Sequence, residues 1–103
     1  MSIQNELRTF RLRIPVRTRD GQGAPVVRYQ DAGTIRAALF KTSAGFPDGE
    51  PEVCVERYTA LVPRRRAVQP DWQLLDGEDA YTVEEAVSSR RWCVAHCVRE
   101  ARV

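Results

Sequence analysis

The chain has 103 residues, 43% of them hydrophobic and 29% charged, which suits one ordinary soluble domain and leaves no room for two. Its net charge is only +2, so bulk electrostatics does not indicate a nucleic-acid binder. No apolar run approaches the roughly 18 residues of a membrane span, and residues 1–7 lack the pattern of a secretory signal, so we expect synthesis in a cytoplasm and no membrane partner.

The first structural pattern is an alternation of apolar and cationic side chains from Arg8 to Arg19. It predicts a half-buried strand whose outer face carries arginines. Pro15 removes one backbone donor and favours an edge strand or a bulge. A dense turn signal at residues 20–23 then separates this run from a second predicted strand over residues 25–31.

A short break at residues 31–33 leads to a third predicted strand over residues 34–41. Residues 42–52 follow, with two glycines, two prolines and three acids around a single aromatic side chain, Phe46. This composition predicts an exposed loop. Long loops in compact domains are often functional, although a merely tolerated insertion is the plain alternative.

The rest of the chain holds more short strands, predicted over residues 53–62, 72–75, 80–87 and 92–98. Turn signals separate them, and three consecutive arginines follow Pro63. The whole pattern predicts an all-β protein: a small barrel or sandwich of six to seven mostly antiparallel strands with one long loop. We expect one domain over residues 1–103, with residues 1–7 and 99–103 as flexible tails.

The three cysteines do not indicate a disulfide framework, because their number is odd and no export signal is seen. Cys93, His96 and Cys97 suggest a zinc site at first sight. On a strand, however, the two cysteines would share one face and His96 would point to the other. We therefore expect Cys54, Cys93 and Cys97 to be buried and reduced, with no metal or other cofactor.

Patterns of catalytic chemistry are missing from the sequence. It has one histidine, no glycine-rich phosphate loop and no Gly-x-Ser-x-Gly, His-Glu-x-x-His or Cys-x-x-Cys motif. The acidic pairs at residues 78–79 and 84–85 fall at turns or strand ends, where solvated surface acids are expected. We predict that the protein is not an enzyme, since no nucleophile or base has an oriented partner.

The predicted elements follow one another in a distinctive order. A basic first strand leads to a glycine-rich turn and Pro25, then to a tyrosine-containing strand, a small-residue step and an Ile-Arg-Ala-Ala-Leu segment, with Asp-Gly-Glu-Asp-Ala-Tyr-Thr-Val later in the chain. This order resembles the phage head–tail joining family, the head-closure or stopper proteins of siphophage-like particles. Arg36 stands where the family carries an aromatic residue, and the segment after Val62 lacks the family's usual Arg-Tyr-Arg run. The matching segments are residues 10–19, 20–25, 29–33, 35–39, 76–83 and 90–97.

The resemblance implies a β-barrel that assembles with copies of itself into a ring, expected to be a hexamer. The ring would lie between the portal–adaptor complex and the tail-terminator and tail proteins, and packaged DNA would pass through it without sequence-specific contacts. We expect such a protein in the host cytoplasm during assembly and then at the head–tail junction of the virion. It would close the head channel after DNA packaging and offer a docking surface to the tail.

The same resemblance implies that the loop at residues 42–52 projects into the DNA channel. Phe46, repeated around a ring, would form an apolar constriction, and Asp48, Glu50 and Glu52 would repel phosphates. The arginine face of the first strand is expected to contact neighbouring subunits or partner proteins. The arginine triplet could do the same, lie free in solvent or contact DNA phosphates. The expected contact residues are Arg11, Arg13, Arg17, Arg64, Arg65 and Arg66.

Two other classes remain open beside the head-closure reading. One is a tail-terminator ring protein. The other is a nucleic-acid-binding barrel of the OB type, which would need exposed aromatic side chains on a basic face. Tyr29, Tyr58, Trp72, Tyr81 and Trp92 mostly fall in predicted strands, so core packing is the expected role for them.

Overall fold

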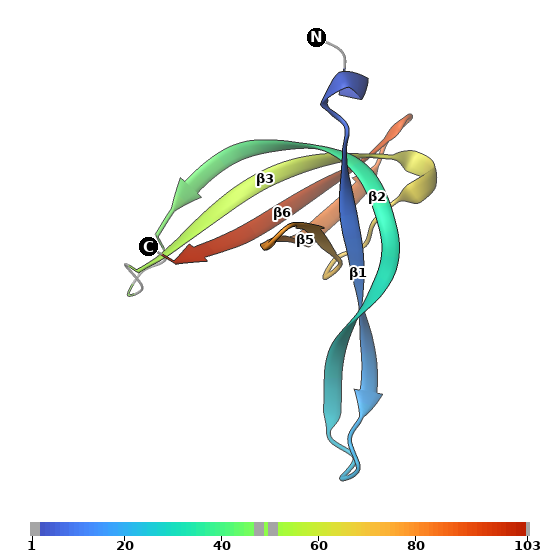
Figure 1. The fold of residues 1–103 in the computed structure, drawn as a ribbon, viewed down its shortest axis with the longest axis vertical. Coiled ribbons are helices and arrows are strands. Elements are labelled where there is room, and N and C mark those ends of the chain that lie inside the picture. Colours follow the sequence, from blue (N-terminus) through green and yellow to red (C-terminus); the bar gives the residue numbers. More distant parts are fainter. Residues whose placement is uncertain (1–2, 47–48, 50–51, 103) are drawn as a thin grey trace.

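The computed structural model describes residues 3–46, 49 and 52–102, and it confirms the predicted all-β fold. Six antiparallel strands form one sheet in the order β1-β2-β3-β6-β5-β4, and β4 pairs back to β1, so that the sheet closes into a barrel (Figure 1). Within these residues, no helix is both long and apolar enough to cross a membrane. The elements are η1 (Ile3–Glu6), β1 (Arg8–Arg19), β2 (Pro25–Gly45), β3 (Val53–Pro63), η2 (Arg64–Arg66), β4 (Gln73–Asp76), β5 (Asp79–Ser88) and β6 (Trp92–Arg102).

The interior of the barrel is filled by side chains that alternate along the strands, as the period of two predicts. Tyr81 lies among the aromatic side chains of this core and meets the rings of Phe10 and Tyr58 edge to face, with centroid distances of 6.2 and 4.9 Å. The core residues are Phe10, Leu12, Ile35, Ala37, Ala60, Val62, Val68, Leu74, Tyr81, Val83, Cys93, Ala95 and Cys97.

The two strands predicted on either side of residues 31–33 are one continuous strand, β2, so the predicted break is wrong. Arg11 pairs with Thr34 and Arg13 with Asp31, which leaves one residue of β1 opposite two of β2. This is a β-bulge, and Gly33 within it has a φ of +86°. The glycine that suggested a strand end marks a bend inside a longer strand.

Two other boundaries differ from the prediction. Residues 42–45 belong to β2, so the connection between β2 and β3 is only residues 46–52 and not 42–52. Residues 99–102, expected as part of a tail, belong to β6 and pair with residues 53–56 of β3. Both extensions consist of small or polar residues, and composition alone therefore resembles a loop and a tail.

The paired strands β1 and β2 run far beyond the barrel and give the molecule its elongated shape, 52 × 35 × 24 Å along its principal axes (Figure 1). β4 pairs with β1 only at residues 11–13. Past Arg13, β1 has β2 as its single neighbour, and the two strands continue as a twisted ribbon to the turn at residues 20–24. We call residues 14–30 the arm.

Candidate interaction surfaces

The arm consists of six cross-strand pairs, from Ile14 with Gln30 to Arg19 with Pro25. Its turn is fixed by Asp20, whose carboxylate accepts hydrogen bonds from the backbone N–H groups of Gln22 and Ala24 at 2.8 and 2.9 Å. A two-stranded ribbon alone is only marginally stable in water. The arm is therefore a projection whose own contacts supply little burial, and it has both faces available to a partner.

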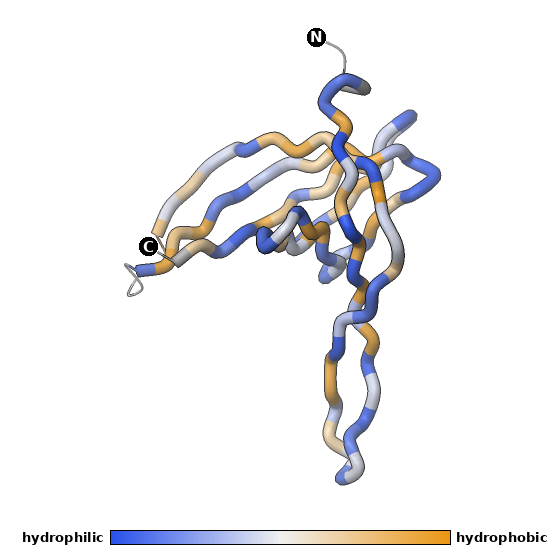
Figure 2. The backbone as a smooth tube through the Cα atoms, viewed as in Figure 1, coloured by the Kyte–Doolittle hydropathy of each residue, from blue (hydrophilic) through white to orange (hydrophobic). Residues whose placement is uncertain are grey.

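One face of the arm combines cations with apolar groups. Pro15 pairs with Tyr29, and Arg17 pairs with Val27, so all four side chains lie on the same side of the ribbon. The Arg13 guanidinium lies over the Tyr29 ring, 5.6 Å from its centroid. Val27 is 52% exposed and Tyr29 37% exposed, and Figure 2 shows hydrophobic segments alternating with hydrophilic ones along the arm.

The sequence predicts the cationic half of this face but not the apolar half. The alternation in β1 is visible in the sequence, but the partner of each β1 residue depends on the register of the hairpin. Tyr29 is one of the aromatic residues for which the sequence predicts packing in the core. The structure leaves this ring on the arm, outside the barrel core.

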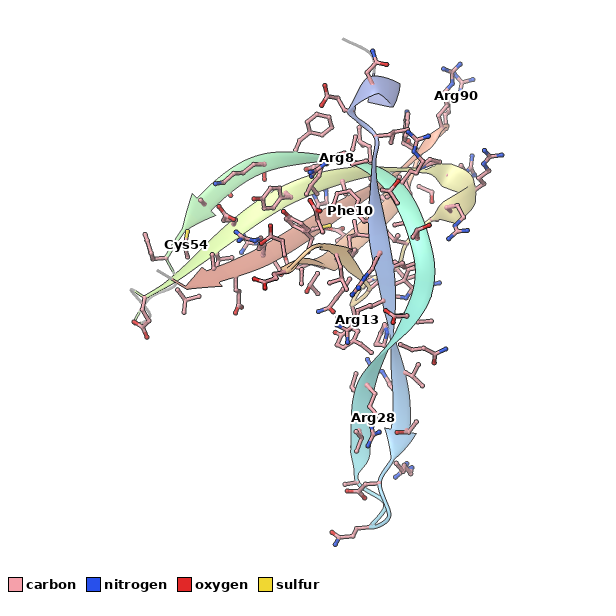
Figure 3. All side chains as sticks on the ribbon, in the orientation of Figure 1. Arg8, Phe10, Arg13, Arg28, Cys54 and Arg90 are labelled. Carbon is pink, nitrogen blue, oxygen red and sulfur yellow. The ribbon has the colours of Figure 1, made fainter. Side chains whose placement is uncertain are left out.

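The predicted contact residues of β1 differ in their surroundings. Arg11 is exposed on the outer wall of the barrel, whereas Arg13 is half-buried against the Tyr29 ring (Figure 3). Arg17 forms an ion pair with Asp71 at 3.8 Å, with both side chains more than 60% exposed. An exposed pair of this length contributes little to stability, so Arg17 remains accessible.

The arginine triplet lies on a different surface from the arm arginines. The backbone N–H of Arg64 donates to the carbonyl of Arg91 at 3.0 Å, and this bond joins η2 to the β5–β6 turn. The Arg66 guanidinium donates to the carbonyl of Thr34 at 3.1 Å, which joins η2 to β2. Three segments that are distant in sequence thus meet at one end of the barrel.

This end of the barrel carries six exposed arginines, and we call it the basic pole. Figure 3 shows Arg90 at its outer tip, on the turn that leads into β6. The triplet was visible in the sequence, but its three companions come from β2 and from the β5–β6 turn, so only the topology brings them together. The residues of the basic pole are Arg36, Arg64, Arg65, Arg66, Arg90 and Arg91.

The β2–β3 connection lies at the opposite end of β3 from the basic pole (Figure 1). Phe46 is 57% exposed and borders a shallow hollow of about 300 Å³ together with Val55 and Arg57. Glu52 is exposed as well. The other two predicted gate residues, Asp48 and Glu50, lie outside the described residues.

A chain of ion pairs crosses four neighbouring strands on the inner face of the sheet, beside Tyr58 and beyond the buried core. Glu56 of β3 accepts hydrogen bonds from Lys41 of β2, at 2.6 Å, and from Arg99 of β6, and Arg99 also binds Asp79 of β5 at 2.8 Å. The hydrogen bond from Lys41, followed by that from Arg99, lowers the pKa of Glu56 to about 2. The two cations and the two carboxylates of this chain are therefore paired with one another across the sheet.

The cysteines on β6 are part of the core, as predicted. Cys93 and Cys97 are buried, and burial raises the pKa of the Cys97 thiol to about 12, which makes it a poor nucleophile. His96 is exposed on the opposite face of the strand. Cys54 differs from the prediction because it is only half-buried. In the described part of the chain, no three His, Cys, Asp or Glu side chains are grouped to hold a metal ion.

Comparisons with known proteins show a likeness in fold to a solved structure. No family model matches the sequence, and no curated protein matches it. Among solved structures, a chain of the "Virion of native gene transfer agent (GTA) particle" superposes with a TM-score of 0.80 and 18% sequence identity. The match covers 93% of this chain and 96% of the other. The two chains share one fold.

Proposed function

We propose that the protein is a structural component of a phage-type virion and forms a ring at the head–tail interface. The observation that carries this proposal is the end-to-end match, over 93% of this chain, to a chain of a gene transfer agent virion, a particle of phage origin. The match covers almost the whole of both chains, and a match of this extent supports a shared role more strongly than a match confined to a sub-motif. In this role the ring closes the head channel after DNA packaging and presents a docking surface to the tail.

The arm supports assembly as the mode of action. Half-exposed tyrosine and valine side chains beside arginines are typical of protein interfaces, in which aromatic residues and arginine are enriched. The outer edges of the arm carry unpaired backbone groups of β1 and β2, which can accept a partner's strand. Residues 38–45 of β2, which pair only with β3, extend such an edge beyond the arm. We propose that the arm, with Arg11 at its base, contacts the neighbouring subunit or the partner rings.

The connection at residues 46–52 is the proposed closure of the channel. Phe46 supplies an exposed apolar group, and Glu52 supplies a charge that repels phosphate. A ring of copies would repeat both around the opening. The ion pairs of Glu56 join β2, β3 and β6 in the part of the sheet from which the connection leaves.

The test is removal of the gene from the genome that encodes the particle. We expect filled or leaking heads and detached tails, which electron microscopy of the lysate distinguishes. Tails of irregular length attached to normal heads would instead indicate the tail-terminator role. Normal, infectious particles would refute a virion role of either kind.

A further inference from the structure

We propose that the basic pole binds the phosphate backbone of double-stranded DNA without sequence specificity. The choice of DNA rests on the proposed function, because a connector meets packaged DNA. The grouping of the arginines itself follows from the fold of the barrel and does not depend on the proposed function. The overall charge of +2 conceals it, since six of the sixteen cations of the chain gather at this one end.

Five of the ten cations outside the basic pole form ion pairs with carboxylates. Ion pairs with carboxylates involve Arg8, Arg17, Lys41, Arg57 and Arg99. None of the six pole arginines forms one with any carboxylate in the described ranges. Their mutual repulsion is therefore uncompensated in the isolated subunit, and a polyanion would relieve it.

The basic pole is hollowed between its arginines. A cavity of about 620 Å³ is lined by three arginines of the pole and by Asn5, Leu7, Pro63 and Trp92; the arginines are Arg36, Arg65 and Arg91. A second hollow of about 340 Å³ adjoins it and is bordered by Arg36, Arg65 and Arg66. Neither lining includes a carboxylate among the residues described. Guanidinium groups that converge on a concave surface suit phosphate oxygens, which accept paired hydrogen bonds from arginine.

The composition of the pole favours nucleic acid over an acidic protein. Protein interfaces have an apolar centre from which charged residues are depleted, whereas protein–DNA interfaces are polar and strongly positive. The exposed large hydrophobic residues of the described chain are Val27, Tyr29, Phe40, Phe46 and Val87, and none of them lines either hollow. The sequence-independent character follows because backbone phosphates are the same for every base pair.

The position of the pole relates it to the proposed closure. The pole and the β2–β3 connection are at opposite ends of β3, which spans roughly 33 Å at about 3.3 Å per residue. With β3 aligned along the channel, the pole would contact the duplex about ten base pairs from the closing residues. The ring would then bind DNA phosphates at the level of the basic pole and repel them at the level of the β2–β3 connection.

The experiment measures binding of the full chain to a short labelled DNA duplex of random sequence by fluorescence anisotropy, over a series of salt concentrations. The pole variant carries Arg65→Gln and Arg91→Gln. Its matched control carries Arg19→Gln and Arg28→Gln, which remove the same charge from the arm. We expect the slope of log K against log salt to fall in magnitude by about 2 in the pole variant and to stay unchanged in the control.

A third variant, Arg65→Lys with Arg91→Lys, keeps the charges, and we expect it to keep the slope. It also separates loss of binding from loss of folding. Equal slopes in the pole variant and the control, or no binding of the duplex at low salt, would overturn the inference. Binding of poly-glutamate as tight as that of the duplex, with the same loss in the pole variant, would overturn it in favour of an acidic protein partner. These outcomes are independent of the gene-removal test, because they concern the subunit and not the particle.

Discussion

Gly33 offers the sharpest test of how the sequence sets the bend between barrel and arm. Its φ of +86° is a conformation that side-chain-bearing residues adopt at a cost of about 1–2 kcal/mol, and no atom lies within 4 Å of the position that a Cβ would take. Gly33→Ala should therefore lower the free energy of unfolding by about 1–2 kcal/mol through the backbone alone. For a domain of this size that is a fall in Tm of roughly 4–16 °C.

Gly45 in the same strand provides the matched control. It also has open space around a Cβ, but its φ lies outside the left-handed region. Gly45→Ala should raise the free energy of unfolding by about 0.4–1 kcal/mol, because the unfolded chain loses freedom without strain in the folded one. Urea unfolding of both variants, with unchanged m-values, measures the two effects. If Gly33→Ala were neutral or stabilising, the bulge would not depend on glycine and the reasoning would be wrong.

The other predictions concern the charges and the closing segment. Arg11→Glu with Arg13→Glu should block head–tail joining and lower stability by no more than about 1 kcal/mol, the loss of one cation–aromatic contact; a normal infectious titre would refute the assignment. Glu56 stabilises the fold above its ordinary pKa of 4.5, and this contribution disappears as the pH falls toward about 2. Glu56→Gln should therefore lower stability at neutral pH and flatten its decline between pH 4.5 and 2, and an unchanged acid profile would contradict this. Deletion of residues 44–50 should give filled heads that leak DNA, whereas full retention of DNA would exclude the closure role.

The sequence predicts most of the barrel because local signals and long-range pairing agree there. In β1, the alternation places Phe10 and Leu12 in the core, and both are buried. Ile14 and Val16 continue the alternation but are only half-buried, because they lie on the arm. The cysteines of β6 are placed correctly by the same kind of alternation. The break expected at residues 31–33 was wrong because Gly33 serves a bulge, and composition does not distinguish a bulge from a turn.

The interaction surfaces were less predictable than the core. The arginine triplet was visible as a run, but Arg36 and Arg91 join it only through the closure of the sheet and the hydrogen bond between η2 and the β5–β6 turn. The arm could not be anticipated either. Its length depends on where β4 stops pairing with β1, and β4 has only four residues with weak sequence signals.

The bulge and the narrowest seam of the barrel occupy the same stretch of β1. Residues 11–13 face the bulged part of β2 on one side and pair with β4 on the other, and no other described residue of β1 pairs with β4. β1 and β2 are also the two strands that continue into the arm. A partner that pulls the arm sideways therefore applies torque where the barrel is closed by only three residue pairs between β1 and β4. Docking at the end of the arm is in this way mechanically connected to opening of the barrel at the β1–β4 pairing.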